Sequence, residues 1–312
     1  MTTDQISHNN DRWPDLTDCT LCPRECHINR NAGNIGYCGQ TVRLTAARAA
    51  LHFWEEPCLS GTNGSGAVFF SGCSLRCVYC QNHEIAQGYS GKEISVPRLS
   101  DIFLELQEKR AHNINLVTPT HFVPQIITAL ETAKKQGLTI PVVYNTSAYE
   151  KVDTLKRLEG LIDIYLPDLK YYDSALSAQY SHAPDYFEKA SLAIAEMVRQ
   201  VGTPVFTAEE DSLMQRGVIV RHLLLPGCGN DSRHILRYLY ETYKNDIYVS
   251  IMNQYTPLSQ VQKIPSLNRH VSKRSYDRIV DYAISLGIEQ AFIQEGTAAS
   301  ESFIPAFDYE GL

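Results

Sequence analysis

Short apolar runs alternate with amphipathic stretches from about residue 65 to the end of the chain. Six runs have the length and near-continuous apolar character of buried strands: Gly66–Phe70, Ile114–Val117, Ile140–Tyr144, Leu161–Leu166, Val218–Leu224 and Ile247–Met252. Between them, apolar residues recur at helical spacing, as in Val123, Ile126, Ile127, Leu130 and Ala133, and again in Tyr186, Ala190, Ala193, Ile194, Met197 and Val201.

Serine residues predict where two of the helices begin. Ser272 is expected to cap a helix that runs to Leu286, and Ser100, followed by Asp101, to cap an earlier one. Apolar strands that alternate with helices favour a parallel sheet covered by helices, the α/β class. Six such units predict a partial (β/α)6 barrel of the TIM type, with chemistry on the loops at the carboxyl ends of the strands.

The segment before residue 65 shows little periodicity and is rich in Asn, Gly, Pro and Cys. This composition predicts a small loop-rich segment held together by a metal. We therefore expect two parts, a cysteine-rich N-terminal extension over residues 1–60 and the barrel over residues 61–312.

Composition narrows the class of protein. The hydrophobic fraction of 44% supports a real core, and the net charge of −7 makes nucleic acid an unfavoured partner. No apolar run approaches the roughly 18 residues of a membrane span, and the N-terminus lacks the apolar centre of a secretory signal. We expect a cytoplasmic protein, in which the nine cysteines indicate metal binding or catalysis rather than disulfides.

Three of these cysteines, Cys73, Cys77 and Cys80, follow the first barrel strand directly. Three thiolates can hold an iron–sulfur cluster and leave one iron without a protein ligand, which suits catalysis. The alternative is a structural zinc site. Such a site needs four ligands, and His83 would have to supply the fourth.

The spacing Cys-x3-Cys-x2-Cys, with the aromatic Tyr79 before the last cysteine, resembles the motif of the radical S-adenosylmethionine (SAM) superfamily. The resemblance implies a [4Fe-4S] cluster whose open iron chelates the amino and carboxylate groups of SAM. One electron then cleaves SAM to methionine and a 5′-deoxyadenosyl radical, which abstracts hydrogen from a substrate. It also implies a low-potential electron donor of the flavodoxin or ferredoxin type.

Further segments resemble the activating enzymes of glycyl radical enzymes: CQN (Cys80–Asn82), YNTSAY (Tyr144–Tyr149), LPDLKYY (Leu166–Tyr172) and VIVRHLLLPGCGND (Val218–Asp231). Over nearly its full length the chain is similar to an uncharacterised branch of homologues of pyruvate formate-lyase activating enzyme. The resemblance implies that Lys170 and Arg221 face SAM or substrate as catalytic candidates. The cofactor-binding candidates in these motifs are Tyr79, Asn82, Asn145, Asp168, Lys170 and Arg221, and Thr118, Thr120 and Asn253 are candidates by their position after the second and sixth strands.

The chain departs from the activating enzymes at two of these places. They carry Gly-Gly-Glu after the second strand, where this chain has Val117–Phe122, and Thr118 and Thr120 offer hydroxyls but no charge. After the sixth strand, Asn253 lies in MNQYTP where the activating enzymes have a histidine-containing segment.

A second cysteine group, Cys19, Cys22, Cys26 and Cys38, spans 20 residues near the N-terminus. Four thiolates form a closed set that suits a structural zinc ion or a fully ligated iron–sulfur cluster. A zinc ion would stabilise a segment that is too short to form its own hydrophobic core, whereas a cluster would relay electrons into the barrel.

Four remaining residues have weaker claims. Cys228 is expected near the barrel mouth, as a hydrogen-atom donor or as a buried loop thiol, and Cys58 as a buried thiol. Glu55 and Glu56, just before the first predicted strand, either orient a ligand or are solvated.

The sequence thus predicts a radical SAM enzyme acting on a protein or peptide, such as a glycyl radical enzyme, or on a small metabolite. The alternative from another class is a cluster- or zinc-carrying scaffold or electron-transfer protein without SAM turnover.

Overall fold

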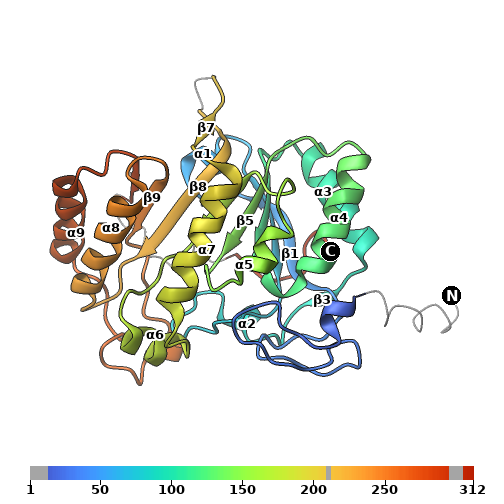
Figure 1. Ribbon diagram of the computed structural model, residues 1–312, viewed down its shortest axis with the longest axis horizontal. Coiled ribbons are helices and arrows are strands. Elements are labelled where there is room, and N and C mark those ends of the chain that lie inside the picture. The colour runs from blue at the N-terminus through green and yellow to red at the C-terminus, as the bar shows by residue number, and fades with distance from the viewer. Residues whose placement is uncertain (1–12, 209–211, 295–304) are drawn as a thin grey trace, which may run out of the picture.

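The structure, a computed structural model, describes residues 13–208, 212–294 and 305–312 (Figure 1). Within these ranges one sheet runs in the order β10-β9-β8-β6-β5-β4-β2-β1-β3, with β7 paired to β8. Its strands are β1 (Thr45–His52), β2 (Ser65–Phe70), β3 (Lys92–Glu93), β4 (Ile114–Val117), β5 (Val142–Thr146), β6 (Ile164–Pro167), β7 (Val205–Phe206), β8 (Met214–Leu223), β9 (Tyr248–Met252) and β10 (Ala291–Ile293).

The sheet is parallel from β2 to β10 along this order, and β1 and β3 are antiparallel at the other edge. All six predicted strands are present, and among the described residues no pairing joins β10 to β3. The predicted partial barrel is therefore confirmed.

Helices connect and cover the strands. They are α1 (Pro57–Ser60), α2 (His83–Ala86), α3 (Val96–Glu108), α4 (Val123–Lys135), α5 (Val152–Lys156), α6 (Ser174–Ser181), α7 (Tyr186–Val201), α8 (Gly229–Tyr243) and α9 (Lys273–Leu286), with 3₁₀ turns η2 (Pro14–Leu16), η3 (Thr120–Phe122) and η4 (Ser259–Val261). In the ranges that the structure covers, no helix is long and apolar enough to cross a membrane.

One helix start is as expected and another is not. Ser272 caps α9, and its side chain accepts a hydrogen bond from the Ser275 backbone N–H. The prediction for Ser100 is wrong, because Ser95 caps α3 and Ser100 is buried inside that helix. Pro97 lies in the first turn of α3, where the missing N–H removes no helical hydrogen bond, so the helix can begin before it.

The expectation of little regular structure before residue 65 is also wrong in part, because β1 lies there and pairs with β2. Half of its sequence, TAARAALH, is alanine, which signals strand only weakly. Pairing with β2 along its whole length stabilises it, a contact between separate segments that a local pattern does not show. The division of the chain at residue 60 stays a prediction.

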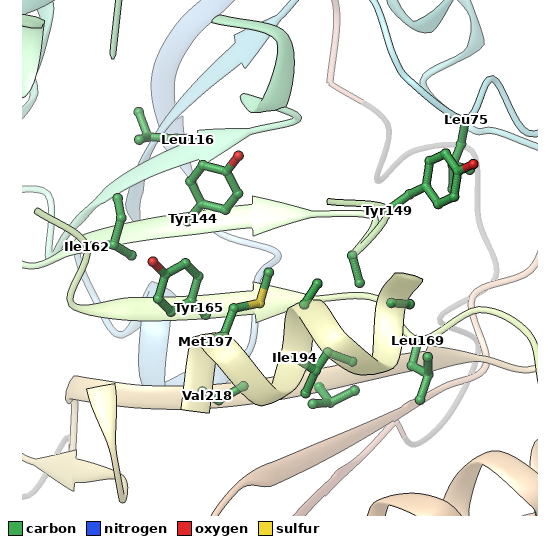
Figure 2. Packing of buried hydrophobic residues seen from close by; sticks show 14 of the residues in the cluster. Leu75, Leu116, Tyr144, Tyr149, Ile162, Tyr165, Leu169, Ile194, Met197 and Val218 are labelled. Carbon is green, nitrogen blue, oxygen red and sulfur yellow. The ribbon is translucent and has the colours of Figure 1, made fainter. Parts of the chain in front are cut away.

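The outer face of the sheet forms the main hydrophobic core. Figure 2 shows Tyr144 and Tyr165, from β5 and β6, beside Ile194 and Met197 of α7. The two tyrosine rings meet edge-on with centroids 5.8 Å apart, and the Tyr165 hydroxyl donates to Gln200 Oε1 at 2.6 Å. Each such side chain contributes about 1.5–3 kcal/mol by burial.

The inner face carries the alternate residues of the same strands. Val143, Ile164 and Ile219 pack there with Cys58 and Leu59 of α1. Because β1 is antiparallel to β2, its last residue pairs with the first of β2, so α1 follows at the amino ends of the parallel strands. In Figure 1, α1 lies at the opposite end of the sheet from the N-terminal segment. Helix α1 thus closes the inner face at the amino ends of the parallel strands. The carboxyl ends of the strands border the space in which a site can form.

Candidate functional site

A cavity of about 700 Å³ occupies the inner face of the partial barrel, above α1. Its wall takes in the three-cysteine loop after β2, the carboxyl ends of the six further strands β4, β5, β6, β8, β9 and β10, and the segment between β1 and α1. Predicted site residues that line it are Cys73, Cys77, Cys80, Asn82, Thr118, Asn145, Asp168, Lys170 and Arg221. The fold therefore brings together residues from the whole length of the barrel.

The three-cysteine loop begins at Gly72, whose φ is +92°. A Cβ there would collide with the Cys38 carbonyl, so the close approach of the two segments requires glycine. The Ser181 hydroxyl donates to Cys77 Sγ at 2.9 Å, and the Leu75 N–H donates to Cys73 Sγ at 3.4 Å. Hydrogen bonds of this kind tune the reduction potential of an iron–sulfur cluster.

The three thiols all line one cavity. Among the described residues, no three His, Cys, Asp or Glu side chains are placed to hold one metal ion together. Each thiolate of a cubane binds a different iron, so three cysteines on one loop that faces a cavity fit that group. His83 begins α2 and does not line the cavity, so nothing supports a zinc site closed by this residue.

A network of charged side chains crosses the cavity between β6 and β8. Arg221 donates to Asp168 Oδ1 at 2.7 Å, to Asn145 Oδ1 at 2.6 Å and to Glu55 Oε2 at 3.1 Å. Lys170 Nζ donates to Asp168 Oδ2 at 2.7 Å. Burial would raise the pKa of Asp168, but Arg221 and Lys170 hold it below its usual range, so Asp168 is charged. Arg221 therefore has one orientation, fixed by three acceptors.

Glu55 and Glu56 line this cavity. The sequence alone did not decide whether they face a ligand or solvent. Glu55 accepts from Asn115 Nδ2 at 3.0 Å as well as from Arg221, and Glu56 is only 8% exposed. Burial raises the pKa of both carboxyls, and Arg221 opposes the shift. Sequence reasoning missed His52 at the end of β1 and Ser250 in β9, which also line the cavity. The pairing of strands, rather than any motif, brings these two residues there.

Thr118 lines the cavity with an unusual backbone. It follows β4 directly with a φ of +58°, a conformation that is uncommon for a β-branched residue. Its N–H donates to the Asn145 carbonyl at 2.9 Å, which joins the ends of β4 and β5. Backbone strain of this kind collects at functional sites.

Three other predicted cofactor-binding residues do not line the cavity. Tyr79 lies within the cysteine loop and is buried, and its hydroxyl accepts a hydrogen bond from the Tyr171 hydroxyl. Thr120 starts the turn η3, and its side chain points into the protein and donates to Glu150 Oε1 at 2.5 Å. Asn253 uses its backbone N–H to bind Gln294 Oε1 at 2.8 Å. For Thr120, the turn η3 directs the side chain away from the inner face.

The two solitary cysteines are also away from the cavity wall. Cys228 caps α8 and is half-buried, and burial raises the pKa of its thiol to about 11. Cys58 packs in the core beside Leu59, and burial raises the pKa of its thiol to about 12. Both remain protonated at neutral pH, which matches buried, unreactive thiols.

The four N-terminal cysteines are free thiols in one loop-rich segment, and Cys19 and Cys38 are buried. A Cβ on Gly36 would lie 3.7 Å from Cys26 Sγ and 3.6 Å from Cys38 Sγ, so these two sulfurs flank that glycine. Within the described chain, no three of the four thiols are placed around one ion. The segment packs on the other cysteine loop, where the Cys73 N–H donates to the Cys38 carbonyl at 3.2 Å.

Comparison with known proteins identifies the family to which this fold belongs. The family model of the radical SAM superfamily matches residues 67–227, more than half of the chain. The chain is 25% identical over 277 residues to the uncharacterised protein MJ0674 of Methanocaldococcus jannaschii, which covers 85% of this chain and 74% of that protein. It is 25% identical over 170 residues to the pyruvate formate-lyase-activating enzyme of Clostridium pasteurianum, or 50% of this chain and 69% of that enzyme.

A solved structure shares the fold. Streptococcus suis SuiB bound to S-adenosylmethionine superposes with a TM-score of 0.50 and 13% identity, over 72% of this chain and 49% of SuiB. This chain therefore spans about half the length of SuiB.

Proposed function

This chain belongs to the radical SAM superfamily, and from that premise we propose that Cys73, Cys77 and Cys80 hold a [4Fe-4S] cluster and that the enzyme cleaves SAM reductively. When bound, such a cluster supplies the electron that splits SAM into methionine and a 5′-deoxyadenosyl radical. The radical abstracts a hydrogen atom from a substrate that enters the same cavity. The observation that carries the proposal is the opening of three thiols onto a 700 Å³ cavity with a buried charge network.

The residues of the chain position the reactants. Arg221 and Lys170 together place two positive charges against Asp168, so the network is rigid before a ligand arrives. Asn145 and Thr118 add polar groups at the ends of β5 and β4. Apolar walls exclude water, which protects a carbon-centred radical from side reactions.

SAM cleavage tests this proposal directly. Protein reconstituted with iron and sulfide without oxygen, and reduced with dithionite, is expected to release 5′-deoxyadenosine. Cys77→Ala should abolish release, whereas Cys228→Ala, which changes a thiol away from the cavity, should retain it. In the opposite outcome, the wild-type protein carries a cluster yet neither cleaves SAM nor changes its electron paramagnetic resonance signal when SAM is added. That result would refute the enzyme and favour a cluster-carrying scaffold without SAM turnover.

For the substrate, we propose a protein or peptide, and a glycyl radical enzyme as the most specific candidate. The support is the resemblance to the activating enzyme of Clostridium pasteurianum over half of this chain. A flavodoxin- or ferredoxin-type donor would reduce the cluster, and nine free thiols suit the reducing cytoplasm. Anaerobic capture on the immobilised enzyme should retain a partner that acquires a SAM-dependent glycyl radical. If a small metabolite alone accelerates SAM turnover, the protein target is wrong.

We also propose a second metal group on Cys19, Cys22, Cys26 and Cys38. Its support is four thiols in one short segment that has little apolar core of its own. Metal analysis after reconstitution separates the forms: about four irons and one zinc per chain indicate a structural zinc, and about eight irons indicate a second cluster. About four irons without zinc would refute the second site.

A further inference from the structure

The floor of the cavity is acidic. Glu55 and Glu56 lie between β1 and α1, and both line the cavity from the end opposite the cysteine loop. The role inferred for this floor rests on the proposed SAM-dependent hydrogen abstraction. It concerns binding of the substrate of that reaction.

The register of the sheet separates this floor from the cysteines. Glu55 bonds to Asn115, which pairs with Ala67 in β2, whereas the cysteine loop starts after Phe70 at the end of that strand. Three residues of strand correspond to about 10 Å. The acidic pair therefore lies deeper in the barrel than the cysteine loop.

Of the two floor carboxylates, only Glu55 has an ion-pair partner among the described residues. Lys170 is bonded to Asp168, and Arg221 divides its donors among Asp168, Glu55 and Asn145. Glu56 forms no salt bridge with the residues that the structure describes, and its buried Oε2 has no hydrogen-bond partner there. Ser250 hydrogen-bonds this carboxyl and Arg221 acts on its pKa, but a buried carboxylate without a direct ion pair is unfavourable, so the position can take a further positive group.

The walls above the floor are apolar. Phe69 and Val117 are buried and line the cavity, and Leu223 and Met252 line it from the opposite strands. An apolar channel that ends in carboxylates matches a long side chain with an apolar stem and a charged tip. We propose that the Glu55–Glu56 floor binds a cationic group of the substrate, a protonated amine or a guanidinium, while the carbon stem lies along these walls.

Burial raises the pKa of Glu56, and a cation bound beside it would lower that pKa again. A floor that binds a cation in this way would distinguish a charged ligand from a neutral one of the same shape.

Binding of small probes tests the inference. Equilibrium dialysis of the reconstituted, unreduced enzyme with SAM would compare labelled N-acetyl-lysine amide and N-acetyl-arginine amide with the neutral N-acetyl-norleucine amide. We expect wild-type protein to bind the cationic probes about tenfold more tightly, equivalent to about 1.4 kcal/mol. Glu56→Gln should bring the ratio close to one, and Glu56→Asp should retain part of it. Glu131→Gln, at an exposed site on α4, should keep the wild-type ratio.

The outcomes separate this inference from the proposed function. If wild-type protein releases 5′-deoxyadenosine on reduction but binds all probes equally, the cationic floor is refuted and SAM cleavage stands. If charge preference depends on Glu56 but no SAM is cleaved, the proposed function fails and the binding site stands. A loss of SAM affinity in Glu56→Gln, without a change in the probe ratio, would assign the carboxylate to SAM and overturn the inference.

Discussion

Replacing Arg221 with methionine removes the charge at the centre of the cavity but keeps a side chain of similar length. Arg221 is 13% exposed in its side chain and donates to three acceptors, of which Asp168 and Glu55 are carboxylates. Among the described residues, methionine would leave Asp168 with Lys170 as its cation. Glu55 would keep the amide donors of Asn115 and Asn145. The variant therefore leaves buried negative charge without its main counterion.

Removal of one partner from a buried ion pair costs about 3–5 kcal/mol of unfolding free energy. At about 2 °C per kcal/mol for a chain of this size, Tm should fall by about 6–10 °C. The loss should depend on pH. The lowered pKa of Asp168 means that its stabilisation is present above its unfolded pKa and is lost as the pH falls through the folded pKa. Without Arg221 that pKa rises, so the carboxyls take up protons more easily and the loss should be smaller at pH 5 than at pH 8.

Thermal unfolding followed by circular dichroism measures these shifts. Arg43→Met is the matched control, because Arg43 forms an exposed ion pair with Glu93 at 3.1 Å and such pairs contribute less than about 1 kcal/mol. A Tm for Arg221→Met within 2 °C of the control, or a deficit that does not change between pH 5 and pH 8, would refute the electrostatic reasoning.

Three further changes test other parts of the structure. Asp231→Asn should lower the unfolding free energy by about 1–3 kcal/mol in urea titrations, because this carboxylate accepts two backbone N–H groups before α6; an unchanged midpoint would contradict that role. Ser272→Ala should cost about 1 kcal/mol by removal of the α9 cap, and Ser272→Asp should restore it. Burial raises the pKa of Glu150 to about 7, so wild-type protein should lose about 3 kcal/mol of stability as the pH rises from about 4.5 to 7, and Glu150→Gln should not show this loss.

Local patterns revealed much of the barrel. Four of the predicted strands, β2, β4, β5 and β6, are short apolar runs that are buried on both faces, so their character does not depend on which neighbour they meet. The cap at Ser272 is equally local, because donor and acceptor are three residues apart. β1 was missed for the opposite reason: its alanines become a strand through pairing with β2, about 20 residues later.

The sequence by itself determined the chemistry expected of this protein. Spacing alone keeps Cys73, Cys77 and Cys80 on one loop, and the segments around Asp168 and Arg221 point to a radical SAM fold that the family match confirms. Which side chains share the cavity was decided by tertiary structure. Neighbours in sequence diverge at turns, so Thr118 lines the cavity and Thr120 does not. Residues far apart converge because strands pair side by side, which brings Glu55 to Arg221, 166 positions away, and makes an acidic pair before a proline the buried floor of the site.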